Sequence, residues 1–261
     1  MRKIFLLLFL IAALHATAQD EYQLAPPLLK YSSVFFTDKA ALTMSLRHPG
    51  AVIRYTTDGT EPNEKSRVYT NQLSVTAIQQ TIRARSFAPG FKPSDVVAVS
   101  FVKDGIPVKN ITGTAPDPAY SAKGMRTLYD NAGGSTDLHG GTWLGYMKDT
   151  VEFIVDAGTA RPMKKILLSV LQQKGSWIYL PVWVTVDKWN GATKSFQAFM
   201  SYDFSGNEKA EDGIVFRDLI FPKGTVAGKL RIHIGTLKKI PSGLPGENES
   251  GWLFIDEIKL F

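Results

Sequence analysis

The sequence predicts an all-β protein built from two tandem β-sandwiches. After residue 20, short β-branched and aromatic segments recur every ~8–12 positions with turn residues between them, a pattern typical of sandwich folds. No segment in this part of the chain shows the 3.6-residue periodicity of an amphipathic helix. The 261-residue chain has no cysteine, so packing of the two cores must stabilise the fold without disulfides or a zinc-thiolate site.

The first residues predict a secretory signal peptide. Arg2-Lys3 precedes the apolar run Ile4–Leu14, and Ala16-Thr17-Ala18 supplies the small residues of a cleavage site, so residues 1–18 are assigned to it. The run is shorter than the ~20 apolar residues of a membrane-spanning helix, and no later segment is longer. We therefore expect a secreted or periplasmic protein with no membrane span, in which residues 19–27 lead into the first sandwich.

The first predicted sandwich covers residues 28–103. Val52–Thr56 alternates in polarity and meets the turn dipeptide Asp58-Gly59. Thr81–Phe87 alternates in the same way, which buries one face and turns two arginines into water. The predicted strands are Ser33–Phe36, Ala41–Leu46, Val52–Thr56, Leu73–Val75, Thr81–Phe87 and Val96–Val102.

Residues 104–107 predict a linker, because Asp104-Gly105 and Pro107 interrupt the strand pattern. Residues 108–261 then predict a second, larger sandwich. Its expected strands are Thr150–Asp156, Lys164–Leu171, Trp177–Asp187, Lys194–Tyr202, Gly213–Phe216, Gly228–Thr236 and Trp252–Leu260.

Two blocks of the first half carry a family resemblance. They read "YTTDGTEP" at Tyr55–Pro62 and "IRARSFAPGFKPSDV" at Ile82–Val96. This stretch resembles the chitobiase/β-hexosaminidase C-terminal domain, a fibronectin-III-like sandwich. The resemblance implies an accessory module that acts as a spacer or support and carries no chemistry of its own.

The second half resembles a galactose-binding-like sandwich (discoidin, or factor V/VIII type C) with jelly-roll topology. The blocks that carry the resemblance are "LYDNAGGSTDLHGGTWLGY" (Leu128–Tyr146), "VEFIVDAG" (Val151–Gly158), "SWIYLPVWVTV" (Ser176–Val186) and "GWLFIDEIKLF" (Gly251–Phe261). The tandem order resembles the tail of bacterial family 20 β-hexosaminidases without their catalytic domain. One departure is that Asp130 is followed by Asn131-Ala132-Gly133-Gly134, where the family has an Asp-Gly turn.

Catalytic motifs are absent from the sequence, so we predict that the protein is not an enzyme. Asp256-Glu257 is an adjacent acidic pair, but neighbouring strand residues point to opposite faces and would not share a pocket without distortion. The four histidines show no metal-binding spacing, and no Gly-x-Ser-x-Gly elbow or phosphate loop occurs. The net charge of +6 is spread along the chain, which argues against a nucleic-acid site.

The resemblance of the second half also implies a structural Ca²⁺, held where an early acidic loop meets the last strand. Calcium takes about six to eight oxygen ligands, many of them backbone carbonyls. The glycine-rich loop from Asp130 to Asp137 can supply carbonyls, and Asp130, Asp137 and Glu257 can supply charge. The alternative is a solvated acidic loop that an ordinary hydrogen bond closes.

All five tryptophans lie in the second half: Trp143, Trp177, Trp183, Trp189 and Trp252. Between Trp177 and Trp189, alternate residues fall into two sets, one for each face of a strand. One set is apolar, and the other contains Trp177, Tyr179, Trp183, Asp187 and Trp189. A regular strand would place this row away from the core, as a binding surface or under covering loops. We expect loops to cover Trp177 and Trp183, whereas Pro181 can bulge the strand and reset the parity.

These aromatic residues predict a carbohydrate-binding site, because sugar rings stack on indoles while their hydroxyls bond planar polar groups. The expected ligand residues are Trp189, Asn190 and Lys188 at one turn, and His139 and Trp143 on the loop after residue 137. A structural role for Trp143 stays open. The expected partner is a glycan or oligosaccharide, with N-acetylhexosamines inherited from the family resemblance. The alternative is an accessory module that docks onto a separate glycosidase or a cell-envelope protein.

Overall fold

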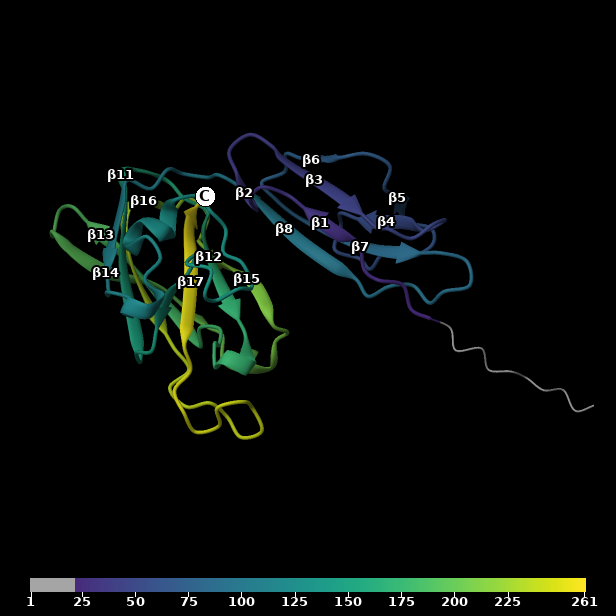
Figure 1. Ribbon diagram of the computed structural model, residues 1–261. Helices are drawn as coiled ribbons and strands as arrows, with labels where there is room; N and C mark the ends of the chain where they lie inside the picture. The colour runs from purple at the N-terminus through teal and green to yellow at the C-terminus, as the bar shows by residue number, and fades with distance from the viewer. Residues whose placement is uncertain (1–21) are drawn as a thin grey trace, which may run out of the picture.

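The computed structural model describes residues 22–261, which form two β-sandwiches lying side by side (Figure 1). The prediction of two tandem sandwiches in an all-β chain is confirmed. The predicted signal peptide, residues 1–18, lies outside the described residues. Within residues 22–261 there is no helix with the length and apolarity that crossing a membrane requires.

The first sandwich packs a three-stranded sheet, in the order β1-β3-β6, against a five-stranded sheet, in the order β2-β8-β7-β4-β5. Its strands are β1 (Leu28–Lys30), β2 (Phe35–Phe36), β3 (Ala40–Ser45), β4 (Val52–Thr56), β5 (Arg67–Val68), β6 (Leu73–Val75), β7 (Gln79–Phe87) and β8 (Val97–Lys103). In β7, Ile82 and Ala84 are buried, while Arg83 and Arg85, which alternate with them, are partly exposed, as the alternation predicts. The short strands β1 and β5 were not predicted.

The second sandwich packs a four-stranded sheet, in the order β10-β17-β12-β15, against a five-stranded sheet, in the order β14-β13-β16-β11-β9. Its strands are β9 (Asn110–Gly113), β10 (Leu144–Tyr146), β11 (Thr150–Pro162), β12 (Lys165–Gln172), β13 (Trp183–Asn190), β14 (Ser195–Asp203), β15 (Gly213–Ile220), β16 (Val226–Gly235) and β17 (Leu253–Leu260). Four short 3₁₀ helices lie in the connections: η1 (Pro118–Tyr120), η2 (Gly124–Tyr129), η3 (Lys174–Ser176) and η4 (Asn207–Lys209). The strands β9 and β10 were not predicted.

The predicted strand Trp177–Asp187 is wrong in its first half. Helix η3 comes directly before Trp177, whose φ of 60° is left-handed, and β13 begins only at Trp183. Tyr179 is buried and donates its hydroxyl to the carbonyl of Pro245, so it does not belong to an outward row. The physical reason is that Pro181 has no N–H for a ladder, so the chain crosses this region in an irregular conformation. The predicted parity holds only from Trp183 onward.

The two sandwiches share an apolar contact. Leu167 of β12 is fully buried and belongs to the core cluster of the first sandwich, and Phe216 and Phe261 pack against that cluster. The rings of Phe35 and Phe216 lie 5.6 Å apart across the junction. The predicted linker is itself held, because Ile106 N–H donates to the carbonyl of Leu260 at 2.7 Å. In Figure 1 the C-terminus accordingly lies beside β2.

Candidate functional site

Trp189 lies near the end of β13, on the face of the five-stranded sheet that points away from the core. Val184 and Val186 of the same strand are fully buried, whereas the Trp189 side chain is 38% exposed. We predicted a turn at this position, but the turn follows at Gly191–Lys194, and Trp189 is paired with Phe196 of β14. A paired strand holds the indole more rigidly than a turn would.

Aromatic and cationic neighbours surround the indole on this outer face. The Phe196 ring meets it edge to face, with ring centroids 5.1 Å apart. Lys229 Nζ lies 5.8 Å from the centroid of the Trp189 ring, and the guanidinium carbon of Arg231 lies 4.8 Å from that of Phe196. Edge-to-face and cation–π contacts of this kind fix ring orientation, and each contributes about 0.5–1.5 kcal/mol.

Each cation of this face has a carboxylate partner on a neighbouring strand. Arg231 donates from Nε and Nη2 to Asp187 Oδ2, at 2.9 and 2.6 Å. Lys229 Nζ lies 3.4 Å from Asp156 Oδ2. The outer face around Trp189 therefore combines an exposed indole with paired charged groups, and it carries no large local charge. We call the residues Trp189, Phe196, Asp187, Lys229 and Arg231 the sheet-face site.

Asn190 and Lys188 do not point into the sheet-face site. The Asn190 side-chain oxygen accepts from the N–H groups of Ala192 and Thr193, at 2.9 and 3.3 Å, so it shapes the turn. Lys188 has the opposite strand parity from Trp189, and its Nζ lies over the ring of Phe199 at 5.4 Å. Of the three residues predicted around this turn, only Trp189 offers an open aromatic face.

Trp143 was predicted either to bind sugar or to have a structural role, and the structure shows it buried. Its side chain is 1% exposed, and the indole Nε1 donates to the carbonyl of Ser135 at 2.8 Å. It packs with Phe254 of β17, in the other sheet of the sandwich from Trp189. The physical reason is that the loop before it folds back over the indole, which shields it from solvent.

His139 is exposed on the same loop, but it too is separate from Trp189. Its ring centroid lies 6.1 Å from that of Tyr120, which in turn contacts Trp252 and Phe254 beside the four-stranded sheet. The two predicted halves of the site therefore lie on different sheets. Trp252, one of the residues that Tyr120 contacts, is partly buried.

The residues that complete the sheet-face site were not assigned from the sequence, although a signal for them exists. Lys229 and Arg231 alternate with the buried residues Leu230 and Ile232, so β16 shows the period of a half-buried strand. That period places both cations on one outer face. What the sequence does not show is that β13 and β16 are neighbours in the sheet, with Asp187 opposite Arg231.

The acidic pair Asp256-Glu257 departs from the expected alternation. Ser169 is paired with Glu257 and Val170 with Ile255, so a β-bulge leaves Asp256 unpaired in the ladder. This distortion buries both carboxyl groups in the same region, beneath the loop that begins at Asp130. The backbone N–H of Gly134 donates to Asp256 Oδ2, while Asp256 Oδ1 and Glu257 Oε2 have no protein partner.

Burial changes the protonation of this pair. Desolvation raises the pKa of Asp256 from 3.8 to about 7. Desolvation also raises the pKa of Glu257 to about 8, against the opposing effect of the neighbouring Lys259 ammonium. The native state therefore binds protons that an unfolded chain would release at neutral pH.

We expect this proton binding to make stability depend on pH. Because the folded pKa of Asp256 is raised, its contribution is fully present below 3.8 and is lost as the pH rises through about 7. The free energy of unfolding should fall by on the order of 2–4 kcal/mol across that range. Denaturant titrations at several pH values measure it. Asp256→Asn keeps the acceptor for Gly134 and should make the fall smaller, with the part due to Glu257 remaining. Identical profiles for the two proteins would contradict the assignment.

The three predicted calcium ligands do not converge on one point, although the charge of Asp130 acts on Glu257. Asp137 Oδ1 accepts from His139 N–H within its own loop at 3.0 Å, and Asp130 Oδ2 lies 2.9 Å from Lys123 Nζ. Across residues 22–261 no three His, Asp or Glu side chains converge as metal ligands.

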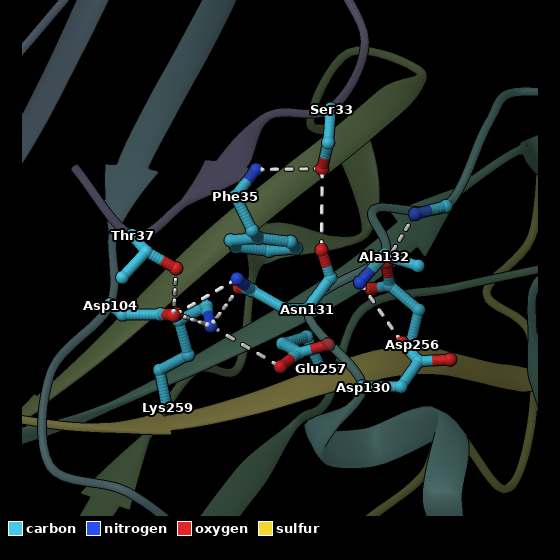
Figure 2. A network of polar contacts seen from close by, with 11 residues as sticks. Ser33, Phe35, Thr37, Asp104, Asp130, Asn131, Ala132, Asp256, Glu257 and Lys259 are labelled. Carbon is cyan, nitrogen blue, oxygen red and sulfur yellow. Dashed lines mark hydrogen bonds and ion pairs between the residues drawn. The ribbon is translucent and has the colours of Figure 1, made fainter. Parts of the chain in front are cut away.

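The remaining predicted ligand, Glu257, already faces a cation. Its Oε1 lies 3.3 Å from the ammonium of Lys259 (Figure 2). A calcium ion held by Glu257 would lie close to that ammonium and be repelled by it. The residues present therefore do not fit the predicted ion.

The fold and the sheet-face site define a tandem β-sandwich protein with an aromatic platform on its second sandwich. Residues 32–98 match the family model of the chitobiase/beta-hexosaminidase C-terminal domain, which confirms the resemblance of the first sandwich. No curated protein matches the chain.

Solved structures similar to this chain include carbohydrate-binding modules. The CBM32 of AlyQ in complex with 4,5-unsaturated mannuronic acid is 16% identical with a TM-score of 0.36, and the match covers 59% of this chain and 95% of that one. CpGH89CBM32-6 of Clostridium perfringens is 14% identical with a TM-score of 0.36, covering 59% and 94%. The lectin domain of Lectinolysin complexed with Lewis B antigen is 16% identical with a TM-score of 0.36, covering 59% and 92%.

Proposed function

We propose that this chain is a secreted or periplasmic, non-catalytic carbohydrate-binding protein whose ligand stacks on the sheet-face site. The observation that carries the proposal is the Trp189 indole, which is exposed on a paired strand and held by Phe196 and Lys229. An apolar sugar face gains contact area on such a ring without having to order it first. The neighbouring pair of Asp187 and Arg231 supplies a planar acceptor and donor for hydroxyl groups.

The charges of the site favour an uncharged sugar. Arg231 and Lys229 are each neutralised by a carboxylate, so a sugar carboxylate would have to displace Asp187 or Asp156 to bond them. N-acetylhexosamine glycans are neutral, and they are the first ligands to test because the family that matches residues 32–98 is named for β-hexosaminidase. A glycan array with neutral and uronate-containing oligosaccharides makes this comparison.

We expect Trp189→Ala to weaken glycan binding by about tenfold or more, since a lost stacking contact costs about 1.4 kcal/mol or more. Isothermal titration calorimetry on the full chain measures the change. Trp177→Ala is a matched control, because that indole is equally exposed, at 39% against 38%, but lies outside the sheet-face site. The control should bind as the wild type does.

Two results would contradict the proposal at different levels. If Trp177→Ala abolished binding and Trp189→Ala did not, the location would be wrong. If the wild type bound no sugar on the array, the function itself would be wrong. Capture of a separate glycosidase from a secreted or periplasmic extract, lost in Trp189→Ala, would then favour the alternative of a docking module.

A further inference from the structure

A buried ammonium lies where the two sandwiches meet. The side chain of Lys259 is 7% exposed, and its Nζ donates to Asp104 Oδ1 and Asn131 Oδ1, both at 2.7 Å (Figure 2). Glu257 Oε1 lies 3.3 Å from the same nitrogen, and the Phe35 ring centroid lies 4.7 Å from it. An ammonium has three N–H donors, so these three oxygens can satisfy all of them.

The partners of Lys259 come from separate parts of the chain. Phe35 belongs to the first sandwich, Asp104 to the linker, Asn131 to the acidic loop, and Glu257 to the last strand. Asp104 extends the network, since its Oδ2 accepts from Thr37 Oγ1 at 3.2 Å and from Asn131 Nδ2 at 3.0 Å. One cation therefore contacts both sandwiches and the segment that joins them.

We propose that the ammonium of Lys259 is the resident cation of this acidic region, in the position where the resemblance implied calcium, and that it locks the two sandwiches together. A buried charge is stable only where it is paired and hydrogen-bonded, and Lys259 meets both conditions. The ammonium faces one oxygen of Glu257, and its positive charge would repel a divalent ion held by the other oxygen. The protein therefore takes its cation from its own chain and needs no metal for its structure.

The geometry of the loop supports the lock. A Cβ added at Gly133 would lie 2.6 Å from Val34 Cγ2 of the first sandwich, so only glycine lets the loop approach so closely. Ser33 Oγ also donates to the carbonyl of Asn131 at 3.4 Å. The stretch from Asn131 to Gly133, which departs from the family's Asp-Gly turn, is thus the part of the loop that contacts the first sandwich.

The first test is the response of the full chain to metal. We expect the wild-type melting temperature to stay unchanged with a chelator and with added Ca²⁺, and calorimetry to show no Ca²⁺ binding. A fall in melting temperature with chelator, or saturable Ca²⁺ binding by the wild type, would overturn the proposal. This test needs no substitution, so it is decisive even if a variant fails to fold.

The second test removes the ammonium. Lys259→Met keeps most of the side-chain volume but leaves Asp104 without its cation and the oxygens of Asn131 and Glu257 without their donor. We expect the melting temperature to fall by about 10 °C. Lys238→Met is the control, since it removes an ion pair to Asp149 in which both side chains are exposed, and it should have almost no effect.

Hydrogen exchange locates the change in Lys259→Met. Residues 31–37, 104–108 and 130–134 should exchange faster in this variant, while the core of β16 stays protected. Equal melting temperatures and exchange in the Lys259 and Lys238 variants would show that no lock exists. If Lys259→Met does not fold, Asp104→Asn weakens the same network from a more exposed position. Its melting temperature and hydrogen exchange are then compared with those of the control.

Discussion

Trp143→Ala is expected to lower the free energy of unfolding by about 3–5 kcal/mol, as truncation of a buried tryptophan usually does. The indole is sealed from solvent, so its removal leaves a cavity next to Phe254 and deprives the Ser135 carbonyl of its donor. The melting temperature should fall by roughly 10 °C in a domain of this size. Chemical denaturation and calorimetry measure both quantities.

Trp189→Ala is the natural comparison for Trp143→Ala, because we expect the two substitutions to have opposite effects on binding and stability. The exposed one should matter for binding and little for stability, whereas the buried one should matter for stability and leave the affinity of the folded fraction unchanged. A Trp143→Ala variant that keeps its melting temperature but loses glycan affinity would show that the loop opens in solution and presents Trp143.

Leu167→Asp is the second substitution with a large expected effect, about 3–5 kcal/mol. Leu167 shares a face of the four-stranded sheet with Lys259, opposite it in the ladder, and is fully buried against the first sandwich. The substitution removes ~1.5–3 kcal/mol of apolar burial and places a carboxylate in the same contact. We expect the two sandwiches to separate while the core of the second sandwich stays folded.

Limited proteolysis of the linker measures that separation. Residues 104–107 are held by the Ile106–Leu260 hydrogen bond in the native chain and should become cleavable in Leu167→Asp. Val226→Asp is the control, because it places the same charge on an exposed apolar residue of the same sandwich. An uncut linker in Leu167→Asp would mean that the sandwiches hold together without this contact.

The same contact bears on the choice of protein for the binding experiments. A fragment of residues 108–261 would expose Leu167, Phe216 and Phe261, which the first sandwich covers. Such an apolar patch promotes association between copies and could bind ligands non-specifically. The full chain is therefore the right sample for the glycan array.

Local pattern was enough to predict most strands. Val52–Thr56 and Leu73–Val75 were predicted to the residue, since alternation and a following turn mark both ends. The strands that were missed, such as Arg67–Val68 and Leu144–Tyr146, are too short to show a period. The first half of the predicted strand Trp177–Asp187 alternates in sequence but forms no strand. Pro181 cannot donate to a ladder, and Tyr179 is buried where the alternation places it outside.

What the sequence by itself determined is the all-β class, the two sandwiches and the outward position of Trp189, because period-two alternation is a property of neighbouring residues. Which aromatic side chains are buried, and which cation lies against Glu257, was decided only by the tertiary structure. The contacts of Lys259 with Asp104 and Asn131 span 155 and 128 residues. Neighbouring strand residues normally point to opposite faces, but the bulge at Asp256 brings its carboxyl group into the same region as that of Glu257. Burial and charge pairing depend on such distant neighbours, and no local pattern encodes them.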